Sequence, residues 1–154
     1  MTLEELQEIR RAVAQLCAQF PDTYFRDVDE RRAYPDEFVD AVIKAGWLAA
    51  MIPKEFGGSG LGLTEASVIM EQINRSGASA AALHGQMYNM GILLRHGSRA
   101  QQEKYLPLIA AGKLRMQSMA VTEPNTGTDT TQLKTMAVKR DDRYVINEIG
   151  RAHV

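Results

Sequence analysis

Apolar side chains recur every three or four residues along the first two thirds of the chain, which is the period of an amphipathic α-helix. The first such stretch carries Leu6, Ile9, Val13 and Leu16. Thr2 and Glu5 before it form a capping-box pattern, and Ser98 and Gln101 repeat it later. Thr64 is expected to cap a further helix. The apolar spacing, with the capping, proline and glycine residues that bound each stretch, predicts helices over residues 2–21, 35–46, 64–77, 79–95 and 98–112.

Segments of different character separate the predicted helices. Residues 24–34 are highly charged and are expected to be irregular, whereas residues 47–53 are apolar and are expected to be a buried connector. The glycine-rich run 55–62 could suggest a phosphate loop, but it lacks the Gly-Lys-Ser/Thr ending and no strand precedes it. A tight turn between helices is therefore expected there. Pro107 predicts a kink or an early end of the last helix.

The period changes after Gly112, where strand patterns replace helical ones. Residues 114–121 predict a strand with imperfect alternation, and residues 132–140 and 143–147 predict a hairpin around Asp141-Asp142. The fold class is thus mainly α, a helical domain at residues 1–113 followed by the start of a β domain at residues 114–147.

Composition and charge narrow the function classes. Eighteen basic and nineteen acidic residues give the 154-residue chain a net charge of −1, which argues against general nucleic-acid binding. The single Cys17 cannot form an internal disulfide, and no Cys/His cluster has zinc spacing, so no metal site is expected. The longest apolar run, residues 45–53, is too short to span a bilayer. Residues 1–11 lack the apolar centre of a signal peptide, and a cytoplasmic location is expected.

One loop, residues 122–129, has the composition of a ligand-binding segment. It is rich in hydroxyl groups, Pro124 makes the preceding residue extended, and Gly127 permits a close backbone approach. Such a loop can present amides and hydroxyls to a polar ligand. Composition alone leaves an ordinary polar loop equally open.

Residues 119–129, Met-Ala-Val-Thr-Glu-Pro-Asn-Thr-Gly-Thr-Asp, resemble the flavin-binding signature of the acyl-CoA dehydrogenase family. Further blocks resemble the same family in the same order along the chain, up to Asn147. They are residues 45–53, 55–58, 60–62, 96–98, 105–107, 112, 133, 135, 137 and 144–147.

This resemblance implies an acyl-CoA dehydrogenase-type helical domain followed by the truncated start of a β-barrel-like middle domain. It also implies a flavoprotein of fatty acid metabolism that uses FAD to oxidise acyl-CoA to 2,3-enoyl-CoA. The catalytic glutamate of the family lies in a C-terminal helical domain with no counterpart in these residues, so this chain alone is expected to be inactive. An acyl-CoA oxidase on the same scaffold and a non-enzymatic helical interaction domain are the alternatives.

The resemblance also assigns residues to the cofactor. Met119, Ala120, Val121 and Thr122 correspond to the segment against the flavin ring. The two residues that correspond to contacts with the FAD pyrophosphate are Gly127 and Thr128, and the latter also approaches the acyl-CoA. Two departures stand out, because Met119 replaces an aromatic residue and Thr128 replaces a serine.

Three residues of the predicted helix 79–95, His84, Met87 and Tyr88, correspond to a helix that borders the acyl-chain cavity of the family. From the residues alone, His84 fits an ordinary, partly buried histidine. Glu123 has the chemistry of a proton acceptor, but its place within the loop motif favours a structural hydrogen-bonding role.

The resemblance implies partners as well: an acyl-CoA substrate, an electron-transfer flavoprotein as electron acceptor, and other copies of the chain in a tetramer or dimer. The last residues, 148–154, depart from the family pattern and match the translation of a common sequencing-adapter DNA. We therefore expect residues 148–154 to be a non-native tail.

Overall fold

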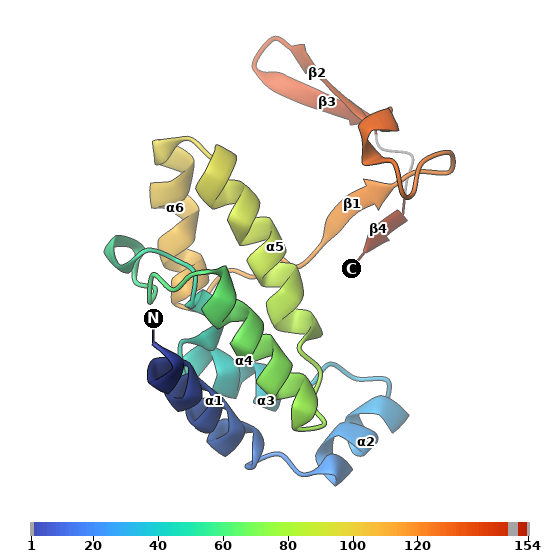
Figure 1. Ribbon diagram of the computed structural model, residues 1–154. Coiled ribbons are helices and arrows are strands. Elements are labelled where there is room, and N and C mark those ends of the chain that lie inside the picture. The colour runs from blue at the N-terminus through green and yellow to red at the C-terminus, as the bar shows by residue number, and fades with distance from the viewer. Residues whose placement is uncertain (1, 148–150, 154) are drawn as a thin grey trace. The chain divides into compact units, whose positions relative to one another are not determined.

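The computed structural model describes residues 2–147 and 151–153. The chain divides into two compact units, a helical unit, Met1–Gln117, and a β unit, Ser118–Val154 (Figure 1). None of the helices in the described part of the chain is long and apolar enough to cross a membrane.

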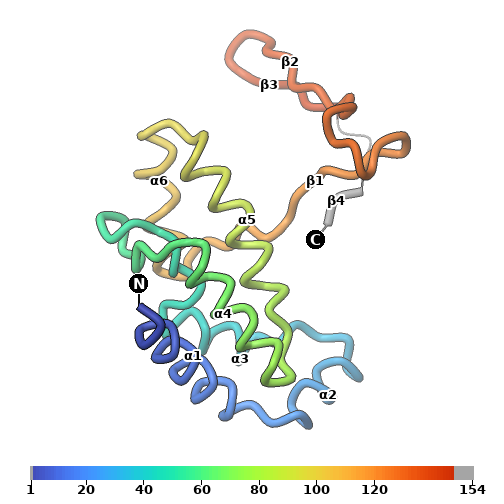
Figure 2. Tube along the Cα trace, in the orientation of Figure 1, coloured from blue at the N-terminus to red at the C-terminus, as the bar shows by residue number. Residues whose placement is uncertain are grey.

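The helical unit contains the predicted helices and one that the pattern does not predict. Its elements, traced in Figure 2, are α1 (Leu3–Cys17), α2 (Asp22–Glu30), α3 (Asp36–Lys44), η1 (Trp47–Ala49), η2 (Lys54–Phe56), α4 (Leu63–Arg75), α5 (Ala81–His96) and α6 (Arg99–Ala110). Both predicted capping boxes are confirmed, because Thr2 pairs with Glu5 before α1 and Ser98 with Gln101 before α6. Pro107 lies inside α6, which continues to Ala110.

Two local predictions are wrong. The charged segment 24–34 is largely helical, because α2 presents Phe25 and Val28 inward while its charged residues face outward. The cap of α4 is also different: Gly62 precedes the helix and donates its N–H to Glu65 Oε2 at 2.7 Å, so Thr64 lies inside the first turn.

One apolar core fills the helical unit. α1 packs against α4, and the predicted connector 47–53 is buried, as expected. The glycine-rich run is confirmed as a turn that folds back on this connector: Gly60 N–H donates to the Ile52 carbonyl at 2.8 Å. Gly58 is required there, since a Cβ would lie 2.1 Å from the same carbonyl oxygen. The fully buried side chains include Val13, Phe38, Val39, Leu48, Ile52, Ile69, Ile73, Leu83, Met90, Leu106 and Ile109.

The β unit consists of short antiparallel pairs. Its elements are β1 (Met119–Thr122), η3 (Thr130–Gln132), β2 (Met136–Arg140), β3 (Arg143–Asn147) and β4 (Arg151–His153). β2 and β3 form the predicted hairpin, with Asp141 in the left-handed conformation at its turn. β1 pairs with β4, with an irregularity in register between Ala120 and Thr122.

The first strand starts later than predicted, at Met119 rather than at residue 114. The reason is that side chains of α5 form hydrogen bonds with the backbone N–H and carbonyl of Met116, which a neighbouring strand would otherwise use. Gln86 Oε1 accepts from Met116 N–H at 2.8 Å, and Asn89 Nδ2 donates to the Met116 carbonyl at 2.8 Å.

The hairpin also starts later than predicted, at Met136 rather than residue 132, because η3 and Glu123 hold the preceding residues. Of the proposed non-native tail 148–154, residues 148–150 and 154 lie outside the described residues. Its remaining residues form β4.

Candidate functional site

The loop that follows β1 is closed by a single carboxylate, that of Glu123. Its Oε1 accepts from Thr135 N–H at 2.6 Å and from the Thr135 hydroxyl at 2.7 Å, and its Oε2 accepts from Lys134 N–H at 2.9 Å. Only 7% of Glu123 is exposed. Hydrogen bonds therefore join residue 123 to residues 134–135. We call residues 123–135 the closed loop.

Hydrogen bonds between residues closer together in the sequence brace the interior of the closed loop. Glu123 and Thr126 exchange backbone hydrogen bonds in both directions, at 3.0 and 3.1 Å, around Pro124-Asn125. Asp129 Oδ1 accepts from Thr131 N–H at 3.1 Å and from the Thr131 hydroxyl at 2.5 Å, which fixes the start of η3. The residues left between these braces are Gly127 and Thr128.

Hydrogen bonding determines the protonation of both carboxyl groups in the closed loop. The Thr135 hydroxyl, and after it the Lys134 backbone N–H, hold the pKa of Glu123 below its usual value. The Thr131 hydroxyl and backbone N–H lower the pKa of Asp129 in the same way. Both groups are ionised at neutral pH, and every hydrogen bond of Glu123 within the described residues is to the loop itself. These bonds fit the structural hydrogen-bonding role expected for Glu123.

The two residues assigned to the pyrophosphate have the donor chemistry that an anion requires. Gly127 and Thr128 are exposed, and no atom lies within 4 Å of the position of a Cβ on Gly127. Within the described residues, neither backbone N–H donates a hydrogen bond. Free amides with open space beside them fit a phosphate group that approaches the backbone closely.

The residues assigned to the flavin ring form β1 itself. Met119, Val121 and Thr122 are half-buried and Ala120 is exposed. The Thr122 hydroxyl forms no hydrogen bond with any described residue, so it can donate to a ligand acceptor. All six assigned cofactor residues belong to the β unit.

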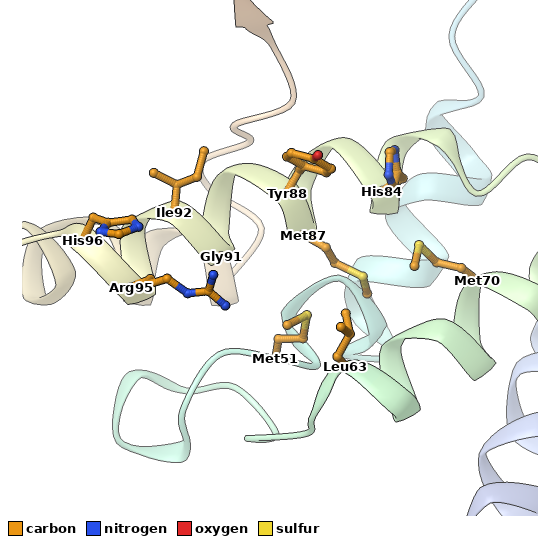
Figure 3. A pocket seen from close by; sticks show the side chains of 10 residues that line it. All are labelled: Met51, Leu63, Met70, His84, Met87, Tyr88, Gly91, Ile92, Arg95 and His96. Atoms are coloured by element: carbon orange, nitrogen blue, oxygen red, sulfur yellow. The ribbon is translucent and has the colours of Figure 1, made fainter. Parts of the chain in front are cut away.

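The residues assigned to the acyl group line a cavity of about 540 Å³ in the helical unit. Figure 3 shows the side chains of Met51, Met70 and Met87 pointing toward one another across this cavity. His84 and Tyr88 stack edge to face at its rim, with ring centroids 5.4 Å apart. The remaining lining residues are Leu63, Gly91, Ile92, Arg95 and His96.

The structure changes the interpretation of two side chains at this cavity. His84 is exposed, not partly buried, because it flanks the buried face of α5 on which Leu83 and Met87 lie. Met51 and Met70 come from other elements, and sequence reasoning missed both. The apolar connector and the α4 stripe favoured packing for these residues, and no local signal marked them as a cavity wall.

Comparison with known proteins gives the family. A profile of the family described as "Acyl-CoA dehydrogenase, N-terminal domain" matches residues 3–113. Bovine mitochondrial isovaleryl-CoA dehydrogenase is 32% identical over 148 residues, which cover 94% of this chain and 34% of that protein.

Solved structures agree with the sequence match. A probable acyl-CoA dehydrogenase from Mycobacterium abscessus superposes with a TM-score of 0.81 at 26% identity, over 96% of this chain and 40% of that one. An acyl-CoA dehydrogenase complexed with FAD from Bacillus anthracis superposes with a TM-score of 0.77 at 25% identity, over 95% and 26%.

The chain belongs to the acyl-CoA dehydrogenase family, and its helices form the N-terminal domain of that family. Its relatives are oxidoreductases, and one solved relative contains FAD. The chain spans about a third of the length of the curated relatives it matches.

Proposed function

We propose that this chain is the N-terminal part of a longer FAD-dependent acyl-CoA dehydrogenase, which oxidises acyl-CoA to 2,3-enoyl-CoA. The observation that carries the proposal is the closed loop after β1, with two adjacent free amides at Gly127 and Thr128. FAD, when bound, would accept the β-hydrogen of the substrate as hydride.

The assigned residues of the β unit would contact two parts of FAD, the flavin ring and the pyrophosphate. The backbone of Met119, Ala120 and Val121 and the hydroxyl of Thr122 hold the pyrimidine edge of the flavin ring. The Gly127 amide and the amide and hydroxyl of Thr128 hold the pyrophosphate, and Thr128 also approaches the acyl-CoA.

The cavity in the helical unit would receive the acyl group. Met87 is buried at its wall, and His84 and Tyr88 form its rim. Unbranched methionine side chains adapt to apolar ligands of different shape, which suits an acyl chain. No residue of this chain corresponds to the family's catalytic glutamate, so we expect no turnover by the chain alone.

The proposal extends to the partners of the longer protein. It would pass electrons to an electron-transfer flavoprotein, assemble as a homotetramer or homodimer and work in the cytoplasm. The unpaired Cys17, which is buried, is consistent with a reducing compartment.

The test uses the longer protein, expressed from its complete gene. We expect a yellow protein whose flavin is bleached by an acyl-CoA in the absence of oxygen and which then reduces an electron-accepting dye. Rapid peroxide production in air would instead identify an acyl-CoA oxidase. A purified protein without flavin, which takes up none when FAD is added, would refute the proposal and favour an interaction domain.

A point variant tests the ring assignment separately. Thr122→Val should weaken FAD binding, because a buried flavin acceptor left without its donor costs about 1–3 kcal/mol. Thr130→Val is the matched control, since Thr130 is an exposed residue of the same unit with no assigned role. Equal FAD affinity in both variants would remove Thr122 from the site.

A further inference from the structure

We propose that Glu123 is a positioning residue for cofactor binding: it holds the closed loop so that the amides of Gly127 and Thr128 face one anionic group. The inference rests on the proposed function, because it takes the pyrophosphate of FAD as that group. It adds a residue that contacts no cofactor and acts through the loop that it closes.

Hydrogen bonds brace the chain on both sides of the free amides. On one side, Glu123 and Thr126 are joined by two backbone hydrogen bonds, and the Thr126 side chain is buried, with its hydroxyl 3.4 Å from the Gln132 carbonyl. On the other side, Asp129 fixes Thr131. The first segment is bonded to the Glu123 backbone, and the chain beyond the second returns to the Glu123 carboxylate through Lys134 and Thr135, so the exposed dipeptide 127–128 is held at both ends.

The charge of Glu123 also favours a positioning role. An ionised, buried carboxylate repels phosphate, so Glu123 is unsuited to bind the pyrophosphate directly. Its oxygens already accept from two backbone amides and one hydroxyl, so its hydrogen-bonding capacity is used within the loop. The favourable use of such a group is to shape the backbone that carries the free amides.

No buried apolar side chain of residues 118–147 supports the closed loop. Glu123 and Thr126 are the only buried residues in 118–147, the part of the β unit whose side-chain burial is described. Without an apolar core beneath the loop, its conformation depends on these polar contacts. Loss of the carboxylate should therefore change the loop, and the change should reach Gly127 and Thr128.

The experiment compares two flavins in the longer protein. Riboflavin carries the ring without the pyrophosphate, so a loop that positions only the pyrophosphate affects FAD alone. We expect Glu123→Ala to weaken FAD binding about tenfold, the size expected when hydrogen bonds to a charged group are lost. Riboflavin binding should stay within about twofold, and Glu123→Gln, which keeps one oxygen, should recover part of the FAD affinity.

Glu65→Ala is the matched control, because Glu65 is also a buried carboxylate that accepts a loop N–H, but lies in the helical unit. It should leave the ratio of FAD to riboflavin affinity unchanged. Equal weakening of both flavins by Glu123→Ala, or no weakening of either, would overturn the inference. Failure of the unsubstituted protein to bind FAD would instead refute the proposed function.

A second measurement does not depend on the cofactor. In the 154-residue chain, amide hydrogen exchange should become faster at Thr126, Lys134 and Thr135 in Glu123→Ala and stay unchanged in Glu65→Ala. Unchanged exchange at these residues in Glu123→Ala would show that the carboxylate does not hold the loop, and would also overturn the inference.

Discussion

The two units of this chain are stabilised by different interactions. The helical unit buries a continuous set of aliphatic and aromatic side chains between its helices. In the β unit every residue of β2 and β3 is exposed, including Met136, Tyr144 and Ile146 at more than 60%. An isolated two-stranded hairpin is marginal in water, and the buried contacts of residues 118–147 are polar ones, those of Glu123 and Thr126.

The unit that carries the candidate cofactor site therefore buries less apolar surface. The helical unit has a core of its own, whereas the hairpin exposes apolar side chains on both faces within the described residues. If the two units are stabilised differently, substitutions and acid should affect them differently.

A matched pair of isoleucines tests the contrast directly. Ile69 is fully buried in α4, so Ile69→Ala should destabilise the chain by about 2–5 kcal/mol through lost burial and a residual cavity. Ile146 lies in β3 and is 64% exposed, so Ile146→Ala should lower the free energy of unfolding by less than about 0.5 kcal/mol. Chemical denaturation followed by the helical circular dichroism signal measures both. Equal losses would mean that the units share one core.

Loss of the hydrogen bond between Gln86 and Met116 should give the next largest loss of stability. Gln86 is fully buried, and its Oε1 is the acceptor for Met116 N–H. Gln86→Leu leaves this amide without its side-chain acceptor but also removes Nε2, which has no hydrogen-bond partner among the described residues, so the expected cost is about 1 kcal/mol, measured by the same denaturation. Gln7→Leu, at an exposed position of α1, is the control and should change stability by less than about 0.5 kcal/mol. Unchanged stability in Gln86→Leu would show that this hydrogen bond does not stabilise the folded chain.

Acid should loosen the β unit through Glu123 and Asp129. Their pKa values are lowered in the folded chain, so their stabilising bonds are complete above the unfolded-state pKa and are lost as the pH falls through the folded-state pKa. Amide NMR signals of Lys134 and Thr135 should therefore shift in the acidic range, below the ordinary pKa of a glutamate. The helical signal should persist through this transition, and its simultaneous loss would contradict the contrast.

Removal of the proposed non-native tail should have the smallest effect. β4 pairs with β1 inside the β unit, so deletion of residues 148–154 removes no contact within the core of the helical unit. We expect an unchanged thermal midpoint of helix unfolding. A clear decrease on deletion would argue that these residues belong to the native fold.

Features that depend on residues close together in the chain could be predicted from the sequence. The helices that start at Leu3 and Arg99 follow from capping boxes within four residues, and the hairpin turn at Asp141 follows from local turn chemistry. The candidate cofactor residues are also local, because 119–128 is one continuous segment whose motif resembles a known signature.

Features that depend on partners far apart in the chain could be seen only in the folded protein. α2 forms in a charged segment because Phe25 and the distant Phe38 pack edge to face, 5.3 Å apart. The first strand starts at Met119 because α5 side chains, about 30 positions earlier, occupy the backbone of Met116. The cavity of Met51, Met70 and Met87 unites three elements. Spacing along the chain reports the period of one element, and contacts between elements leave no such period.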